Sequence, residues 1–104
     1  MFSQILKIGK SFEYYENGNK FAEYTINENE QIDGEYLGWS KSGYLEVKGF
    51  LVNGEKDGAW IERDSKGNYI NGIKDGIWTH WYSFGEAYKE EIYEDGVLIE
   101  KKFL

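Results

Sequence analysis

The chain has 104 residues, including nine Tyr, six Phe, four Trp and thirteen Gly but no Pro and no Cys, and its formal net charge is −7. This length suits one domain, and without Cys there can be no disulfide, catalytic thiol or thiolate metal site. The negative charge argues against direct contact with nucleic acid or an anionic membrane and favours a basic partner. No apolar run approaches the ~18 residues of a membrane-spanning helix, and the first residues lack a secretory signal pattern. We therefore expect a cytoplasmic protein.

Glycine recurs along the chain in four pairs, and the two members of each pair are nine positions apart. The pairs are Gly9 and Gly18, Gly34 and Gly43, Gly58 and Gly67, and Gly76 and Gly85. In the last three pairs an Asp precedes the first glycine, and an aromatic residue stands two positions after it. A regular internal period of this kind is the sequence signature of a repeat protein.

The segments that join the glycine pairs contain Asn-Gly or Asp-Gly, which favour tight hairpin turns because both residues tolerate positive φ. Each unit therefore reads as strand, turn, strand, turn. The sequence predicts an all-β fold, an elongated antiparallel meander of tandem β-hairpin repeats. The single domain 1–104 divides into units at about 8–32, 33–56, 57–74 and 75–98, with 1–7 and 99–104 as caps. Residues 1–7 are expected to form a short helical or strand cap, as repeat proteins need at their ends.

Two units depart from the regular length. In the third unit the next Asn-Gly turn begins four positions after Gly67, whereas in two other units the Asn-Gly or Asp-Gly turn begins ten positions after the second glycine. Six missing residues are an even number, and side chains alternate between faces along a strand, so later residues should keep their original face. In the first unit the corresponding segment has eleven residues. The extra residue predicts a β-bulge within Tyr24–Glu30.

The pattern Asp-Gly-x-Trp, followed by aromatic residues and by a glycine nine positions on, resembles the MORN-type repeat. More closely, it resembles the variant found in the bacterial YwqK family, whose members are described as antitoxins. The clearest matches are Asp57-Gly58-Ala59-Trp60 and Asp75-Gly76-Ile77-Trp78, although Ile8 replaces Asp in the first unit. This resemblance implies stacked hairpins, and it implies a role as an antitoxin or as a structural or lipid-associated scaffold.

Two columns of equivalent residues run through the units. The first column, two positions after the first glycine, holds Tyr36, Trp60 and Trp78, and we expect it to stack along the core. The second, five positions after that glycine, holds Tyr14, Trp39, Arg63 and Trp81. Its parity is opposite, so it should lie on the other sheet face. Because Trp, Tyr and Arg are enriched in binding hot spots, this column is a candidate partner-binding stripe. The alternative is a sheet that curls enough to bury part of this face.

Candidate catalytic and metal-binding residues are few. Glu62 and Asp64 are two apart on a predicted strand and should face the same way, as an acidic rim of the partner site. An acid–base pair of this kind would need a deep cleft. His80 is the only histidine, and its repeat position varies between units, which is typical of a surface residue. A calcium loop fails because Ser40 stands where the bidentate Glu belongs. We therefore expect no catalytic residue, no metal and no cofactor.

The sequence favours a small acidic protein-binding module over an enzyme. The first hypothesis is an inhibitor, an antitoxin or immunity protein that neutralises a basic toxin or nuclease. A phage-encoded inhibitor of a host defence nuclease fits the same features. The alternative is a MORN-type structural or membrane-associated scaffold without an inhibitory role. A basic nuclease or toxin as the binding partner would favour the first hypothesis, and liposome binding would favour the second.

Overall fold

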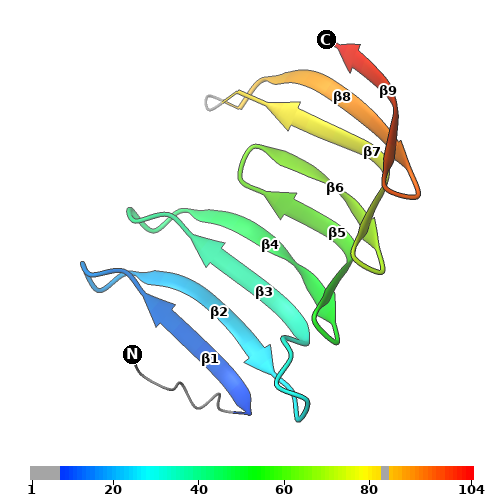
Figure 1. The fold of residues 1–104 in the computed structure, drawn as a ribbon. Helices are drawn as coiled ribbons and strands as arrows, with labels where there is room; N and C mark the ends of the chain where they lie inside the picture. The colour runs from blue at the N-terminus through cyan, green and yellow to red at the C-terminus, as the bar shows by residue number, and fades with distance from the viewer. Residues whose placement is uncertain (1–7, 83–84) are drawn as a thin grey trace, which may run out of the picture.

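The computed structural model describes residues 8–82 and 85–104, so the expected cap at 1–7 lies outside the described residues. The described residues form one sheet of nine antiparallel strands in chain order and contain no helix (Figure 1). The strands are β1 (Gly9–Tyr14), β2 (Lys20–Ile26), β3 (Gly34–Trp39), β4 (Leu45–Val52), β5 (Glu55–Glu62), β6 (Ser65–Ile70), β7 (Ile73–Trp81), β8 (Ala87–Glu94) and β9 (Val97–Phe103). The predicted all-β meander of tandem hairpins is confirmed. This part of the chain has no helix long and apolar enough to cross a membrane.

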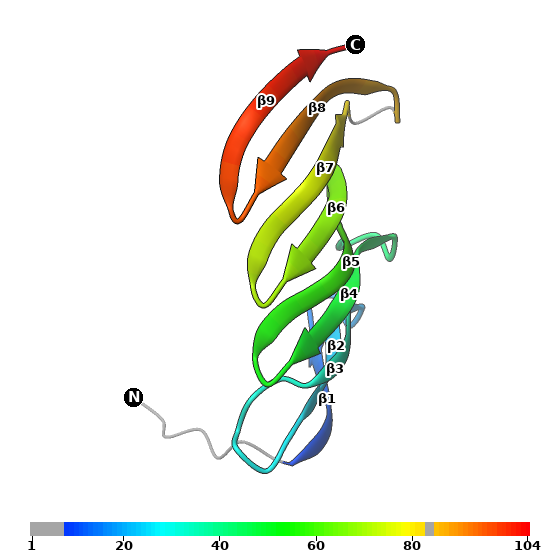
Figure 2. The same cartoon turned by 90° about the vertical axis from the view of Figure 1, so that its right-hand side faces the viewer.

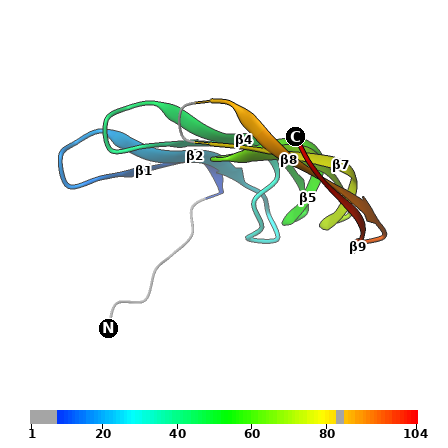
Figure 3. The same ribbon diagram turned by 90° about the horizontal axis from the view of Figure 1, so that it is seen from above.

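The described strands lie in a single curved layer without a second layer over either face (Figure 2, Figure 3). The Cα atoms have a radius of gyration of 15.8 Å and extents of 45 × 31 × 24 Å. A compact chain of this length would have a radius of gyration of about 13 Å. The accessible surface is 7518 Å², against roughly 6,000 Å² for a compact protein of the same mass. The chain is therefore elongated, and its stability must come largely from contacts within one sheet.

The strands begin and end along two borders of the sheet. The border that contains the two-residue Asn-Gly turns is called the turn edge. Asn53 and Gly54 have φ values of 48° and 83°, and Asn71 and Gly72 have 49° and 81°. These left-handed values are the ones that a type I′ hairpin turn requires. The Gly54 amide also donates a hydrogen bond to the Ile32 carbonyl of the preceding unit (2.8 Å). Each turn therefore reverses the chain and joins its unit to the previous one.

The composition of the repeated Asp-Gly dipeptides predicts turns, but these dipeptides do not form turns. Asp57-Gly58 lies inside β5 and Asp75-Gly76 lies inside β7. The Asp side chains instead support the next turn. Asp33 Oδ1 accepts a hydrogen bond from the Asn53 amide (3.1 Å), and the Asp in β5 does the same for Asn71 (3.3 Å). The motif therefore holds neighbouring repeats together at the turn edge.

The opposite border, at which β1, β3, β5 and β7 end, is called the tip edge (left in Figure 1). In three hairpins the ladder shifts just before this edge, so that Tyr14 pairs with Lys20, Trp39 with Leu45 and Trp81 with Ala87. The bulge predicted within Tyr24–Glu30 is wrong, because Tyr24, Thr25 and Ile26 pair with β1 in regular register and β2 ends at Ile26. The extra residue of the first unit belongs to a loop, which the Asn27 amide closes by a hydrogen bond to the Gln31 carbonyl (2.8 Å).

Gly67 lies in strand β6 and not in a turn as its spacing from Gly58 suggests. It pairs with Trp60, as Gly49 of β4 pairs with Tyr36. Gly67 is therefore the structural equivalent of Gly49. Both glycines lie beneath a tryptophan ring of the next unit, where a Cβ atom would come within 2.2 Å of that ring.

The third unit is short because its hairpin ends early at the tip edge (Figure 1). Only two residues, Arg63 and Asp64, separate β5 from β6, whereas the loop from Ser40 to Tyr44 separates β3 from β4. The even number of missing residues keeps later side chains on their original face, as predicted. Tyr69 accordingly belongs to the same hydrophobic cluster as Trp60.

A column of rings crosses the strands on one face, which we call the core face. Ring centroids are 6.2 Å apart for Tyr36 and Trp60, 6.2 Å for Trp60 and Tyr69, and 5.0 Å for Tyr69 and Trp78. Trp60 is 3% exposed and Trp78 is 0% exposed, so the predicted core column is confirmed. The Trp60 indole N–H donates a hydrogen bond to the Phe50 carbonyl (2.9 Å). Rings packed side by side thus provide apolar burial within the single layer.

Candidate functional site

Three of the four residues in the predicted binding column lie at equivalent places on the tip edge. Tyr14, Trp39 and Trp81 each end a strand, and strand alternation puts them on the face opposite the core face. Neighbouring strands are about 4.8 Å apart, so the backbones of the first two lie about 10 Å apart and those of the last two about 19 Å apart. Tyr14 is 61% exposed, and the two Trp side chains are half-buried. The structure therefore brings these rings to one edge and one face.

Arg63 does not continue this column. It begins the turn between β5 and β6 with a φ of 53°, a left-handed value that few non-glycine residues adopt. Its amide donates a hydrogen bond to the Glu46 carbonyl (2.8 Å), and its Nε lies 3.6 Å from a Glu46 carboxylate oxygen. The side chain is 72% exposed. Because its hairpin is short, Arg63 lies beside the column and borders the core face.

The predicted acidic pair is divided between a strand and a turn. Glu62 ends β5 on the core face, where its carboxylate accepts a hydrogen bond from the Tyr69 hydroxyl (2.9 Å) and contacts the Lys56 ammonium. Asp64 is exposed in the turn, and its carbonyl accepts a hydrogen bond from the Trp81 amide (3.0 Å). The two carboxylates do not share a strand face because β5 ends between them. Of this pair, Asp64 presents its charge at the exposed edge.

Lys20 lies between rings on the face opposite the core face. Its ammonium is 5.4 Å from the Phe12 ring centroid and 5.0 Å from the Trp39 ring centroid, which are favourable cation–π distances. It is also 3.0 Å from a Glu23 carboxylate oxygen, and this hydrogen bond lowers the pKa of Glu23. Tyr14, Lys20 and Trp39 line a depression of about 420 Å³. These contacts hold the Trp39 ring in place at the tip edge.

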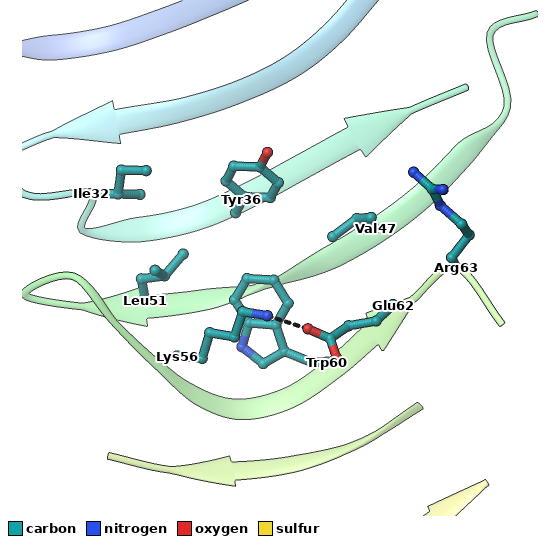
Figure 4. Close-up of a pocket in the computed structure, with 8 residues that line it drawn as sticks. All are labelled: Ile32, Tyr36, Val47, Leu51, Lys56, Trp60, Glu62 and Arg63. Carbon is teal, nitrogen blue, oxygen red and sulfur yellow. Dashed lines mark hydrogen bonds and ion pairs between the residues drawn. The ribbon is translucent and has the colours of Figure 1, made fainter. Parts of the chain in front are cut away.

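A groove of about 370 Å³ lies on the core face of β3, β4 and β5 (Figure 4). Tyr36, Val47, Leu51 and Trp60 give it apolar and aromatic walls, and Arg63 lies at its tip-edge end. Figure 4 shows Arg63 reaching from the end of β5 towards the side of the groove lined by Val47. This groove was not predicted from the sequence. The signal that could have revealed it is the size of Leu51 relative to its repeat equivalents.

His80 lies on the core face, half-buried, and not at a surface position as its variable repeat slot predicts. Its Nε2 lies 2.6 Å from Glu91 Oε1, and Glu91 also lies 3.9 Å from Lys89 and 4.0 Å from Lys101. This Nε2 has no other hydrogen-bond partner, so the contact is a hydrogen bond only when Nε2 carries a proton. Within residues 8–82 and 85–104, no group of three His, Asp or Glu side chains could hold a metal ion. The ion pairs around Glu91 connect the core face to β9.

Comparisons with protein families, with characterised proteins and with solved structures find no match to this chain. The MORN-type resemblance therefore remains an inference from the repeat residues. A function can be based on three observations: the rings at the tip edge, the groove on the core face and the net charge.

Proposed function

We propose that this chain is a protein-binding inhibitor, an antitoxin or immunity protein that neutralises a toxin or a nuclease. A phage-encoded inhibitor of a host defence nuclease is one form of this proposal. The observation that supports it best is the row of Tyr14, Trp39 and Trp81 on one face of the tip edge, with Arg63 beside it. Trp, Tyr and Arg are the residues that most often dominate the binding energy of protein interfaces. A partner covering this edge would bury rings that the single layer leaves accessible.

The net charge of −7 supports a basic partner. Asp64 carries an exposed carboxylate at the tip edge, beside Trp81. Toxins and nucleases that act on nucleic acid carry basic surfaces, because the phosphate backbone dominates their affinity. Attraction between opposite charges would speed association with such a partner, and salt would weaken the effect.

The repeat resemblance adds support for inhibition. Asp57-Gly58-Ala59-Trp60 is similar to the YwqK variant of the MORN-type repeat, whose members are described as antitoxins. A MORN-type scaffold would bind a structural protein or a membrane without abolishing an activity. The acidic charge disfavours an anionic membrane as the target. Inhibition and scaffolding therefore differ in one measurable property, which is the activity of the bound partner.

The experiment combines capture with an activity assay. The tagged wild-type chain and a matched Trp39→Ala variant are cross-linked in the source cells, and proteins enriched by the wild type over the variant are identified. Each such protein is then purified and titrated with the chain. We expect a basic protein whose toxic or nucleolytic activity is lost at a stoichiometric amount of the chain.

Two outcomes would contradict the proposal. A partner that keeps its full activity in the saturated complex would favour a scaffold. Co-sedimentation with anionic liposomes, without a protein enriched over the Trp39→Ala control, would favour a membrane-associated scaffold. Co-expression gives an independent readout, because an antitoxin should restore growth to cells that express the captured toxin.

A further inference from the structure

At one repeat position of the core face, only the last two units have an aromatic ring. Tyr69 pairs with Gly58, Tyr93 pairs with Gly76 and Leu51 pairs with Gly34. Leu51, Tyr69 and Tyr93 thus occupy the same position in successive hairpins, and Ile26, which pairs with Gly9, occupies it in the first hairpin. The Tyr69 ring fills the space between Trp60 and Trp78, with centroids 6.2 Å and 5.0 Å from theirs. At Leu51 the repeat has an aliphatic side chain and no ring.

A second repeat position changes at the same place. Lys56 and Lys74 extend over the rings of their own strands, β5 and β7, with Nζ 4.8 Å from the Trp60 centroid and 4.6 Å from the Trp78 centroid. Their carbonyls accept a hydrogen bond from the Gly72 and Gly96 amides of the next turns, and the Ile32 carbonyl, just before β3, accepts the equivalent bond from Gly54. Ile32 therefore replaces the lysine of the pattern. Both positions beside Tyr36 thus hold an aliphatic residue, Ile32 and Leu51, and the space between them is lined mostly by apolar side chains.

The groove coincides with this gap in the pattern. Its volume of about 370 Å³ falls in the usual range of roughly 300–1,000 Å³ for ligand sites. Tyr36 and Trp60 present ring surfaces with centroids 6.2 Å apart and planes inclined by 31°. Aromatic rings favour edge-to-face or offset contacts with another ring at about 4.5–7 Å. The groove thus offers a third ring two aromatic surfaces that contact each other, together with the aliphatic side chains of Val47 and Leu51.

Arg63 adds a charge at the tip-edge end of the groove. It is 72% exposed, and its one ion pair among the described residues joins Nε to Glu46 at 3.6 Å. The planar guanidinium has five N–H donors, so most of them remain available to a second carboxylate. Lys56 and Glu62 also line the groove, but their charges are paired with each other. The guanidinium at the mouth of the groove therefore favours an anionic group on the occupant.

We propose that the groove receives an aromatic side chain of the partner protein, with a neighbouring carboxylate of the partner bound by Arg63. This inference rests on the proposed function, because the partner is the protein that the chain inhibits. The ring would take the place that Tyr69 and Tyr93 fill in the next units. The carboxylate would belong to an adjacent acidic residue or to a chain terminus.

The groove can be tested without the partner by using amino-acid probes. N-acetyl-tyrosine carries both the ring and the carboxylate, and N-acetyl-tyrosinamide has the ring without the carboxylate. N-acetyl-leucine has the carboxylate, with an aliphatic side chain in place of the ring. NMR chemical shifts of the Val47 and Leu51 methyl groups and of the Trp60 indole report binding. We expect N-acetyl-tyrosine to bind most tightly, about tenfold better than either other probe. Equal affinity of all three probes, or no shift in these signals, would overturn the proposal.

Variants of the chain test the binding of the ring and the binding of the carboxylate separately. Leu51→Tyr supplies the missing ring from within the chain and should abolish probe binding, whereas Ile61→Tyr adds a ring on the opposite face and should leave it unchanged. Arg63→Asn removes the guanidinium at a position where Asn tolerates the positive φ. This variant should bind N-acetyl-tyrosine and N-acetyl-tyrosinamide with equal affinity. If Leu51→Tyr fails to fold, the result with Arg63→Asn still decides the question.

The affinity of these variants for the captured partner distinguishes this inference from the proposed function. If Leu51→Tyr weakens binding of the partner at least tenfold and Ile61→Tyr does not, the groove is part of the partner-binding site. If Leu51→Tyr folds and binds the partner at full strength while inhibition persists, this inference is wrong and the proposed function stands. If no partner loses activity, the proposed function fails, and probe binding alone would show a small-molecule site.

Discussion

The Trp60 ring covers the backbone of Gly49 so closely that a Cβ atom at Gly49 would lie 2.0 Å from the indole Cδ2. Gly67 and Trp78 repeat this relationship, with a nearest distance of 2.2 Å. Glycine is required at both places because a ring from the next unit occupies the position of a side chain. This contact lets a single layer bury large rings against its own backbone.

The first prediction concerns this contact. Gly49→Ala should lower the free energy of unfolding by about 1–3 kcal/mol, because the added methyl group forces the ring to move. Urea unfolding followed by circular dichroism measures the change. In a Trp60→Ala background the same substitution should have little effect, which gives a coupling energy of about 1–3 kcal/mol. An equal loss in both backgrounds would show that the ring is not the cause.

The second prediction compares the two faces. Trp78→Ala should lower the free energy of unfolding by about 3–5 kcal/mol, as for other fully buried large side chains. Trp81→Ala changes a half-buried ring of the same size on the opposite face and is the matched control. Its loss should be less than half as large. Equal losses would mean that the face opposite the core face is also buried.

The third prediction concerns alkaline pH. Burial raises the pKa of Tyr69, and the hydrogen bond to Glu62 raises it further. In the unfolded chain this phenol ionises near pH 10, so above about pH 10 the native state holds the proton that the unfolded chain loses. The free energy of unfolding should then fall with rising pH, by up to about 1.4 kcal/mol per pH unit for this group. Tyr69→Phe should lessen that slope.

Urea unfolding between neutral pH and alkaline pH measures this slope. Tyr44→Phe is the control, because the Tyr44 side chain is 74% exposed. It should leave the pH dependence of the free energy of unfolding as in the wild type. Identical slopes for Tyr69→Phe and the wild type would contradict the prediction.

The fourth prediction concerns the acidic rim. Asp64→Lys should slow association with a basic partner, and the loss should shrink at high salt, because an exposed rim charge steers encounter. Stopped-flow association at two salt concentrations measures this. Glu62→Lys is less specific, since Glu62 also accepts the Tyr69 hydrogen bond and contacts Lys56. A loss that appears only in the dissociation rate of Asp64→Lys would contradict a steering role.

Local chemistry explains which parts of the fold could be predicted from the sequence. Asn53-Gly54 and Asn71-Gly72 act locally, so their turns followed from residue type alone. Trp60 and Trp78 were assigned to the core because equivalent repeat positions share one face. These features need only strand alternation and turn chemistry.

Other features depend on contacts between distant residues. The spacing from Gly58 predicts a turn at Gly67, because spacing does not show whether a glycine lies in a turn or beneath a ring. The shortened hairpin placed Arg63 in a turn and separated Glu62 from Asp64, which the six-residue difference alone could not locate. The groove depends on the size of Leu51 relative to residues in other hairpins, and so it needed the strand register.

The affinity of the Trp39→Ala variant for the captured partner tests the central claim most directly. Isothermal titration should show a loss of about 2 kcal/mol or more, roughly thirtyfold, with the fold retained. Phe50→Ala is the matched control, since Phe50 is an exposed ring in β4 away from the tip edge. It should bind as the wild type does. If Trp39→Ala folds and binds the partner at full strength, the tip edge is not the binding site, and the account is wrong.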